Sequence, residues 1–283
     1  MRTNPITVLM PLKNGMPYLK SSVDSILNQT ESNFKFLIVD DHSTDSSIEY
    51  LKSINDPRIE ILQNEGDGIA DALNTGLQKT NSEYVAIMDS DDISILTRLE
   101  EQKKFLDSNP DCALVGSSII YIGKSSKRKW KLKLPDNDKR IITDLRKGRF
   151  ALAHSTVMMR TKLIKEINGY SNVDYPNIDT NMYLRMSGKG QLMNLSEIYN
   201  YVRLHEFSYT QVNLEKIARQ NYLRDKKNIF SSSYVYPFYL SQKFYKRGLM
   251  LYLDDSKIVW LLWLLLSALL YPKRAINYIR KKI

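Results

Sequence analysis

The sequence predicts an α/β fold with a mostly parallel central sheet, followed by a helical extension at the C-terminal end. Short apolar segments alternate with helical segments over about the first 110 residues, and short loops join them. Such alternation is typical of βαβ units, whose strands pair in parallel. A run of 14 residues without a charge, Ile258 to Tyr271, predicts an apolar helix outside that pattern.

The predicted elements follow one another in regular order. The run Tyr84 to Ile87 is short, apolar and bounded by polar residues, as expected for a parallel strand buried on both faces. The strands are expected at residues 6–11, 35–40, 58–63, 84–88 and 113–122. The helices are expected at residues 17–28, 45–54, 68–79 and 96–107. We expect one domain over residues 1–230, with halves 1–112 and 113–230, and a helical tail over residues 231–283.

The composition is that of a globular protein with excess positive charge. Hydrophobic residues make up 43% and charged residues 25% of the 283 residues, and the formal net charge is +10. The single cysteine, Cys112, excludes an intramolecular disulfide framework and is typical of a reducing compartment. Met1 to Pro5 leads directly into the first strand, so we expect no secretory signal. The basic residues between Lys124 and Lys133 predict a solvated loop or edge hairpin, and we expect no nucleic-acid partner.

The most informative segment is Met88-Asp89-Ser90-Asp91-Asp92, directly after the apolar run Tyr84 to Ile87. Ligands of open α/β sheets bind beyond the carboxyl ends of the strands, where these carboxylates are expected to lie. Three carboxylates in four positions repel one another without a cation, and their hard oxygen atoms suit Mg²⁺ or Mn²⁺ bound with a substrate's phosphates. The alternative is a solvated acidic turn in which Asp92 or Ser94 caps the next helix.

A second predicted strand ends in the same way. Asp40 and Asp41 follow Phe34 to Val39, and His42-Ser43-Thr44 leads into a predicted helix. A carboxylate at a strand end can accept from a base N–H or a ribose hydroxyl, so the pair predicts nucleoside recognition. The alternative is helix capping by Asp41 or Ser43, and the two roles are compatible.

Several ordered motifs resemble those of family 2 glycosyltransferases. They are Thr7-Val8-Leu9-Met10-Pro11-Leu12-Lys13-Asn14-Gly15, Ser25-Ile26-Leu27-Asn28-Gln29-Thr30, Val39-Asp40-Asp41-His42-Ser43-Thr44-Asp45, Asn64-Glu65-Gly66, Ala72-Leu73-Asn74-Thr75-Gly76 and Met88-Asp89-Ser90-Asp91-Asp92. The resemblance covers about residues 5–205 and implies a GT-A fold, a Rossmann-like sheet with a nucleotide-sugar half and an acceptor half. It also implies transfer of a sugar from a nucleoside diphosphate, with inversion at the anomeric carbon.

The resemblance implies roles for the acidic residues. Asp91 is the expected ligand of Mn²⁺ or Mg²⁺, Asp89 is expected to face the donor's ribose or sugar, and Asp92 is a neighbouring contact on the acceptor side. Asp41 is the first choice for reading the nucleobase N–H of a uridine or related donor, and Asp40 is the second. The expected donor-binding residues are Pro11, Lys13, Asn14, Asp40, Asp41, Asn74, Asp89, Ser90 and Arg203.

Two positions at the donor site depart from the family pattern. Lys13 stands where many relatives carry a tyrosine that stacks on the base. Its ammonium is expected either to meet the diphosphate or to point to solvent. Leu73 stands where relatives often have arginine, which removes one phosphate contact.

Asp179 is the expected general base of the transfer. The family places its base on a Glu-Asp pair at the start of a helix, and here that helix begins at Ile178-Asp179. Because Ile178 replaces the usual acid, a like charge that would raise the pKa of the base is removed. The alternative for Asp179 is an acid favoured by the macrodipole at the helix N-terminus.

Three further residues come from the later part of the resemblance. His154 lies in a block similar to the family's His-Pro-Thr on the acceptor side, with Ser155 in place of proline. The alternative role for His154 is that of a buried, hydrogen-bonded structural residue. Tyr201-Val202-Arg203-Leu204-His205 resembles a Tyr-Arg-x-His ending. From it, Arg203 is expected to close over the diphosphate and His205 to add a metal ligand, with core packing of His205 as the alternative.

The C-terminal tail predicts contact with a membrane surface. As a helix, the run Ile258 to Tyr271 spans about 21 Å, less than the ~30 Å of the hydrocarbon core. The basic residues that follow it without an acid are Lys273, Arg274, Arg280, Lys281 and Lys282. We expect a cytoplasmic protein, peripheral on the inner face of the cell membrane, bound through its tail to anionic lipid. The alternative is a helix that packs on the catalytic domain or on a second subunit.

The leading hypothesis is therefore an inverting, metal-dependent glycosyltransferase that builds a surface polysaccharide on a lipid-linked or oligosaccharide acceptor. A nucleotidyltransferase is a second hypothesis, but it should carry a Gly-rich phosphate-binding signature after the first strand, which Pro11 to Gly15 lacks. A third is a non-catalytic, membrane-bound sugar-nucleotide-binding protein, suggested by Ile178 and Val202.

Overall fold

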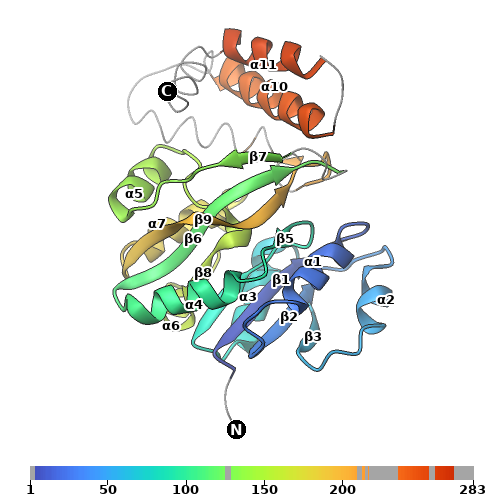
Figure 1. Cartoon of the computed structure of the whole chain (residues 1–283), viewed down its shortest axis with the longest axis vertical. Coiled ribbons are helices and arrows are strands. Elements are labelled where there is room, and N and C mark those ends of the chain that lie inside the picture. Colours follow the sequence, from blue (N-terminus) through green and yellow to red (C-terminus); the bar gives the residue numbers. More distant parts are fainter. Residues whose placement is uncertain are drawn as a thin grey trace. The chain divides into compact units, whose positions relative to one another are not determined.

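The computed structural model describes residues 4–124, 129–208, 212, 213, 216, 235–254 and 259–270 (Figure 1). The chain divides into two compact units. The first unit consists of Met1–Ile120, Leu132–Leu145 and Phe150–Val202. The second unit consists of Tyr121–Lys131, Arg146–Arg149 and Arg203–Ile283.

A nine-stranded mixed sheet organises the fold. In spatial order its strands are β3 (Ile59–Gln63), β2 (Phe34–Asp40), β1 (Ile6–Leu12), β4 (Tyr84–Ile87), β8 (Met158–Arg160), β6 (Cys112–Ile122), β9 (Gln191–Arg203) and β5 (Ile93–Ser94), with β7 (Lys129–Leu132) paired to β6. Strand β1 is parallel to β2 and β4, and β2 is parallel to β3. Strand β8 is antiparallel to β4 and β6, and β5 is antiparallel to β9. The N-terminal strands thus form the parallel part that the βαβ alternation predicts.

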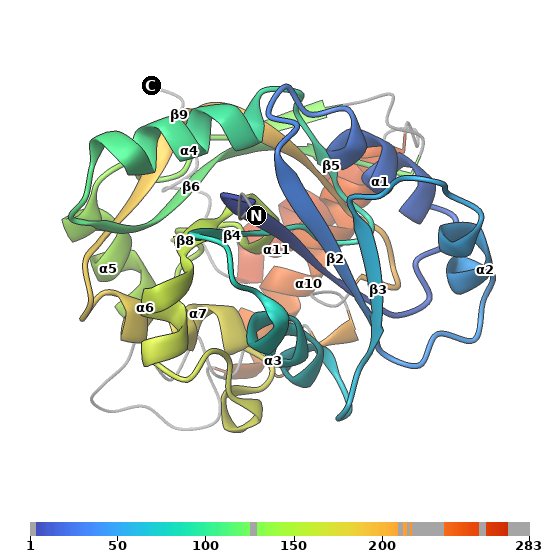
Figure 2. The ribbon, with the colours of Figure 1, turned by 90° about the horizontal axis from the view of Figure 1, so that it is seen from below.

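Helices cover both faces of this sheet (Figure 2). The first face packs against α1 (Leu19–Leu27), α2 (Ser47–Lys52) and α4 (Arg98–Ser108). The second packs against α3 (Ile69–Lys79), α5 (Asp138–Arg146), α6 (Thr161–Glu166) and α7 (Ile178–Met186). In β1, Val8 and Met10 join the first core and Leu9 joins the second, because successive strand residues point to opposite faces. Gly76 of α3 allows close packing there, since a Cβ would overlap the Leu9 side chain.

The parallel register brings three strand ends to one edge of the sheet. Strand β1 pairs with β2 up to Asp40, and β2 pairs with β3 up to the same residue. The Asp41 N–H donates to the last carbonyl of β1 at 2.7 Å, and the Asn64 N–H donates to the Asp40 carbonyl at 2.8 Å. The residues just beyond the three strands, Lys13, Asp41 and Asn64, therefore lie together at the carboxyl edge, where ligands of such sheets bind.

The second unit contains two packed helices, α10 (Val235–Leu253) and α11 (Val259–Leu270). Ser241 and Ser267 are buried between them, and each hydroxyl donates to the other residue's carbonyl oxygen, at 3.0 and 2.8 Å. The rings of Phe244 and Trp263 lie 5.2 Å apart. The predicted apolar run thus forms a helix with one face on α10.

The remaining surface of α11 carries exposed leucines. Leu261, Leu262, Leu265 and Leu269 are between 44% and 76% exposed. No helix in the described part of the chain is both long and apolar enough to cross a membrane. The basic residues after Pro272 lie outside the described residues.

The strands and helices predicted within the first 122 residues are confirmed, with ends shifted by no more than a few residues. The predicted hairpin after Lys124 is represented by β7, although residues 125–128 lie outside the described part. The sequence did not predict β8, which is three residues long, or the long strand β9. The domain boundaries at residues 112 and 230 stay a prediction.

Candidate active site

The carboxylate of Asp41, just beyond β2, is contacted by several hydrogen-bond donors. Its side chain is 5% exposed. Its Oδ1 accepts from Asn64 Nδ2 at 2.7 Å and from the Gly68 N–H at 3.0 Å, and its Oδ2 accepts from Lys13 Nζ at 3.1 Å. Gly68 has a φ of 87°, a left-handed conformation that favours glycine. Burial alone would raise the pKa of Asp41, but the hydrogen bonds from Asn64, Lys13 and Gly68 outweigh it and lower that pKa.

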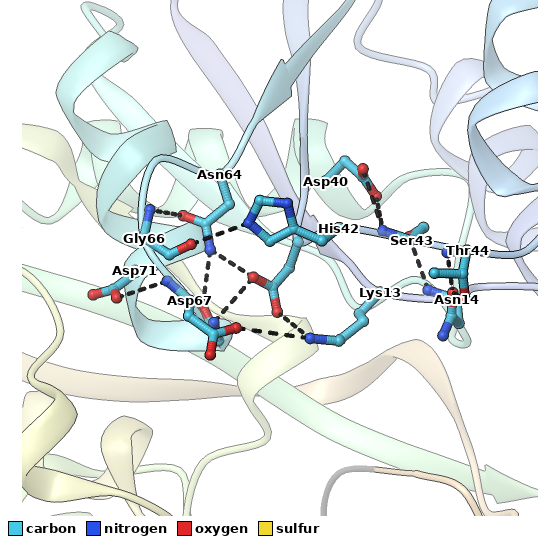
Figure 3. Close-up of polar contacts among 12 residues, drawn as sticks. Lys13, Asn14, Asp40, His42, Ser43, Thr44, Asn64, Gly66, Asp67 and Asp71 are labelled. Carbon is cyan, nitrogen blue, oxygen red and sulfur yellow. Dashed lines mark hydrogen bonds and ion pairs between the residues drawn. The ribbon is translucent and has the colours of Figure 1, made fainter.

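Asp40 and Asn14 form hydrogen bonds with the loop after β2 (Figure 3). Asp40, the second choice for reading the nucleobase, accepts from the Ser43 N–H at 3.2 Å, whereas the capping alternative names Asp41 or Ser43. Asn14 Oδ1 accepts from the Thr44 N–H at 2.7 Å, and the Asn14 N–H donates to Ser43 Oγ at 2.9 Å. The side chains of Asp40 and Asn14 thus hold the loop after β2.

Lys13 lies between two carboxylates. Its Nζ is 3.1 Å from Asp41 Oδ2 and 3.9 Å from Asp67 Oδ1 (Figure 3). Its side chain is 55% exposed, and that of Asp67 is 90% exposed. The Asp41 contact is therefore the one that fixes the ammonium, because ion pairs with fully solvated partners contribute little. Pro11, two residues earlier, lies within β1 opposite Val39.

The acidic cluster beyond β4 brings three carboxylates together. One carboxylate oxygen from each of Asp89, Asp91 and Asp92 lies within 4.8 Å of the others. Asp92 is buried, and its Oδ2 accepts a short hydrogen bond from the Ser155 hydroxyl. Asp89, Ser90 and Asp91 are half-buried. Three hard oxygen donors at this spacing fit Mg²⁺ or Mn²⁺.

A completely buried arginine lies behind this cluster. Arg98 of α4 is 0% exposed, and its Nη2 donates to the carbonyls of Ile87 and Val157 at 2.8 and 3.3 Å. Burial lowers the pKa of Arg98 to about 9, and the charges of Asp89 and Asp92 oppose that shift. Arg98 thus holds the end of β4 while adding a fixed positive charge behind the carboxylates.

His154 links the acidic cluster to Tyr170. Its Nδ1 lies 3.6 Å from Asp89 Oδ1, and its Nε2 is 3.0 Å from the Tyr170 hydroxyl. Asn74 holds Tyr170 in place, because its amide exchanges two hydrogen bonds of 2.9 Å with the Tyr170 backbone. Burial alone would lower the pKa of His154, but the charges of Asp89 and Asp179 outweigh it and raise that pKa.

Asp179 lies in the first turn of α7 and is half-buried. Its Oδ1 accepts from the Thr180 N–H at 2.6 Å, as an acid at a helix N-terminus does. Burial and the charge of Asp179 raise the pKa values of Tyr170 and Tyr183 well above the usual range. The Tyr183 hydroxyl is buried and has no hydrogen-bond partner among the described residues. Asp179, His154 and Tyr170 therefore belong to one electrostatic neighbourhood.

Arg203 and His205 belong to the second unit. Arg203 is 5% exposed, and its Nη1 donates to the carbonyl oxygen of Gly123 at 3.1 Å. His205 is 8% exposed. Their roles at the diphosphate and at the metal stay predictions.

Sequence reasoning did not single out Arg98 or Gly68 as parts of this site, and it noted Ser155 only as a departure from the family pattern beside His154. Arg98 precedes Leu99-Glu100-Glu101, which has the pattern of a solvent-facing helix, so no local signal marks it as buried. Ile167-Asn168-Gly169-Tyr170 resembles a Gly-Tyr block on the family's acceptor side, and this resemblance is the sequence signal for Tyr170.

Comparison with known proteins identifies the family. The sequence model of glycosyl transferase family 2 matches residues 7–167. The O-antigen biosynthesis glycosyltransferase WbnJ of Escherichia coli is 30% identical over 211 residues, covering 72% of this chain and 81% of that protein. The UDP-Glc:alpha-D-GlcNAc-diphosphoundecaprenol beta-1,3-glucosyltransferase WfgD of E. coli is 35% identical over 121 residues, 42% of this chain and 48% of that protein. An uncharacterized glycosyltransferase of Rickettsia bellii is 34% identical over 110 residues, 38% of this chain and 16% of that longer protein.

Solved structures share the fold. Residues 1–349 of Staphylococcus aureus TarS in complex with UDP-GlcNAc have a TM-score of 0.61 at 18% identity, covering 84% of this chain and 71% of that one. The mannosyltransferase PcManGT of Pyrobaculum calidifontis, in complex with GDP-Man and Mn²⁺, has a TM-score of 0.60 at 16% identity, covering 98% and 76%. The expected GT-A fold is confirmed by these neighbours. The family match extends over more than half of the chain, and the chain belongs to glycosyl transferase family 2.

Proposed function

We propose that this protein transfers a sugar, with inversion, from a uridine or related nucleoside diphosphate to a saccharide acceptor in surface polysaccharide synthesis. The observation that carries the proposal is the gathering of Asp89, Asp91 and Asp92 at the end of β4, beside His154 and in the electrostatic neighbourhood of Asp179. The O-antigen enzyme among the relatives supports the polysaccharide role. The name of WfgD supports a lipid-linked acceptor, and the UDP-GlcNAc and GDP-Man complexes support a nucleotide-sugar donor.

In this proposal, the carboxylate of Asp41 recognises the donor's nucleobase by accepting a hydrogen bond from an N–H group of the base. Its lowered pKa keeps it ionised and able to accept. Asp89 and Ser90 contact the ribose or the sugar. Asn14 and Asp40 act through the loop after β2, which their hydrogen bonds hold against the end of β1.

Asp91, with oxygen atoms from Asp89 and Asp92, would hold Mn²⁺ or Mg²⁺. A bound ion supplies positive charge that offsets the charge developing on the leaving diphosphate. Ser155 fixes the orientation of Asp92 by donating to its carboxylate. Arg98 keeps the end of β4 in position through two backbone carbonyls.

Asp179 acts as the general base. Its carboxylate takes the proton of the acceptor hydroxyl while that oxygen forms a bond to the anomeric carbon. The bond between the anomeric carbon and the diphosphate oxygen breaks on the opposite side, so the configuration inverts and the nucleoside diphosphate leaves. Because its neighbour Ile178 is apolar, Asp179 is the single carboxylate in the first turn of α7.

Substituting Asp179 with asparagine tests this assignment. Asp179→Asn should lower single-turnover transfer by about 10²–10⁴-fold, since general-base contributions are of that size. Donor binding should be unchanged, because the base contacts the acceptor. Asn181→Ala, two residues further along the same helix, is the control. Near-full turnover in Asp179→Asn would place the base elsewhere, and absence of transfer from any nucleotide sugar by the wild type would support the non-catalytic hypothesis.

We also propose that the tail places the enzyme on the inner face of the cell membrane. The exposed leucines of α11 supply the apolar contact, and the basic residues after Pro272 supply attraction to anionic lipid. The double substitution Leu262→Gln/Leu265→Gln should abolish flotation with anionic liposomes, and Leu96→Gln, also at an exposed leucine, should leave flotation unchanged. A wild-type chain that ignores liposomes, or floats equally well with neutral lipid in high salt, would contradict this placement.

A further inference from the structure

Lys13 forms an ion pair with Asp41, and the function proposed above gives Lys13 no role. Asp41 is held from the buried side by Asn64 and Gly68, both on Oδ1 (Figure 3 shows Asn64 and Lys13). Its Oδ2 takes one donor among the described residues, Lys13 Nζ at 3.1 Å. The carboxylate is 5% exposed and the lysine side chain 55% exposed, so the accessible part of the pair is its Oδ2 and ammonium end.

Counting hydrogen-bond capacity shows what this end can bind. A carboxylate accepts about four hydrogen bonds, and three of the positions on Asp41 are filled by the contacts above. One acceptor position on Oδ2 is left. An ammonium carries three donors, and Lys13 directs one to Asp41 while the solvated Asp67 lies 3.9 Å away. The pair therefore presents one acceptor next to at least one donor.

An acceptor beside a donor is complementary to a ring N–H beside a carbonyl. Uracil, thymine and guanine carry that edge, while cytosine and adenine carry a ring nitrogen without hydrogen at the corresponding place. Resting on the proposed function, we propose that Lys13 determines nucleotide specificity jointly with Asp41. Asp41 accepts the ring N–H of the donor's base, and Lys13 donates to the adjacent carbonyl oxygen. The donor's base is then one with an N–H next to a carbonyl.

The same contacts argue against a role of Lys13 at the diphosphate. Asp41 cannot follow a moving lysine, because Asn64 and Gly68 fix its carboxylate. If the ammonium left for a phosphate, the buried charge of Asp41 would lose its cation, which is costly for a partly desolvated pair. Lys13 therefore stays beside Asp41 when the donor binds and meets the base from there.

Calorimetry on the full chain with Mn²⁺ tests the proposal in two stages. The wild type is first titrated with UDP, dTDP, GDP, CDP and ADP. We expect one of the first three to bind at least about tenfold more tightly than CDP and ADP, the effect of one charge-assisted hydrogen bond. Tightest binding of CDP or ADP would overturn the proposal and leave nucleotide-sugar transfer intact. Failure to bind any of the five would overturn both.

The second stage asks whether Lys13 reads the carbonyl. If UDP is preferred, the probes are 2-thio-UDP and 4-thio-UDP, because sulfur is a weaker hydrogen-bond acceptor than oxygen. If dTDP or GDP is preferred, the probe is the thio analogue of that nucleotide. The wild type should bind one thio analogue about tenfold more weakly than the parent nucleotide. Lys13→Met should bind parent and analogues equally, Lys13→Arg should keep the discrimination, and Lys20→Met, at an exposed lysine of α1, should behave as the wild type.

The outcomes separate base reading from the other roles of a lysine. A phosphate contact or a structural role predicts that Lys13→Met weakens the parent nucleotide and its thio analogues by the same factor. A lysine that only points to solvent predicts no change in any of them. Either result overturns the proposal. Thermal unfolding of each variant shows whether the fold is retained, and Lys13→Arg keeps the test decisive if Lys13→Met is unstable.

Discussion

The ends of β2 and β4 carry acidic residues after similar apolar runs, yet the structure surrounds them differently. Beyond β2, Asp41 is met by an amide, a backbone N–H and an ammonium of this chain. Beyond β4, Asp89, Asp91 and Asp92 bring three carboxylate oxygens within 4.8 Å of one another, with Arg98 buried behind them. The β2 end is thus a site whose charge the protein itself balances, and the β4 end concentrates negative charge for a cation.

The role of an acidic residue at a strand end therefore depends on the groups that contact it, and not on the local sequence alone. Asp40, one residue before Asp41, caps a turn through the Ser43 N–H. Asp92, one residue after Asp91, is buried against Ser155. Adjacent acids differ in their surroundings because different residues donate to them: Ser43 to Asp40, Lys13 and Asn64 to Asp41, and Ser155 to Asp92.

The largest expected effect comes from removing the metal ligand of the β4 end. Asp91→Asn should lower transfer with Mn²⁺ by about 10³-fold, because a bound cation contributes several kcal/mol to stabilising the leaving charge. Steady-state transfer from a UDP-sugar measures it. Asp67→Asn, an exposed acid near Lys13, is the matched control and should transfer at nearly the wild-type rate. If transfer by Asp91→Asn still depended on the metal, Asp91 would not be the metal ligand, and the contrast between the β2 and β4 ends would not hold.

At the β2 end the expected effect is smaller and independent of the metal. Asp41→Asn should weaken UDP binding by about 10–100-fold, both with Mn²⁺ and with EDTA, because it removes a charged acceptor at the base. The ratio of the two affinities should stay that of the wild type. If that ratio collapsed instead, Asp41 would be coupled to the metal and the two ends would not be separate sites.

A residue that supports the metal cluster should have a milder effect. Ser155→Ala removes the donor to the buried Asp92 carboxylate and should weaken Mn²⁺ binding about tenfold, as changes beside metal ligands do. Titration of the protein with Mn²⁺ alone measures it. Ser53→Ala, which removes an exposed hydroxyl at the end of α2, should leave the affinity unchanged.

The smallest effect is on stability at low pH. The pKa of Asp41 in the folded protein lies below the usual value of an aspartate, about 3.9. Its ionised form therefore stabilises the fold above that pH, and this contribution is lost as the pH falls. The free energy of unfolding of the wild type should exceed that of Asp41→Asn at pH 6, and the gap should narrow towards pH 3. Urea denaturation in EDTA measures both proteins. A gap that widens on acidification would mean that the carboxylate is not held in its ionised form.

Much of the parallel half of the fold could be predicted from the sequence. Strands β1, β2 and β4 are buried apolar runs, and the acids that follow β2 and β4 lie at the carboxyl edge of the parallel sheet. Arg98 could not be found in this way, since its burial depends on contacts with β4 and with Val157, far along the chain. The link from Asn74 through Tyr170 to His154 could not be predicted either, because Asn74 bonds the backbone of Tyr170, which lies 96 residues further along the chain.

The Lys13 position shows the same limit on a smaller scale. Its departure from the family pattern was visible in the sequence, but its two expected destinations were the diphosphate and solvent. The structure places its ammonium against Asp41, because parallel pairing of β1 and β2 brings the residues after both strands together.

The most direct test of the central claim is calorimetry of UDP binding to the wild type in Mn²⁺ and in EDTA, repeated with Asp91→Asn and Lys13→Met. We expect the wild type to bind UDP more tightly in Mn²⁺ than in EDTA. Asp91→Asn should lose this difference, and Lys13→Met should bind UDP more weakly while keeping it. Equal affinity of the wild type in Mn²⁺ and EDTA would contradict the account, because the β4 end would then not be a metal site.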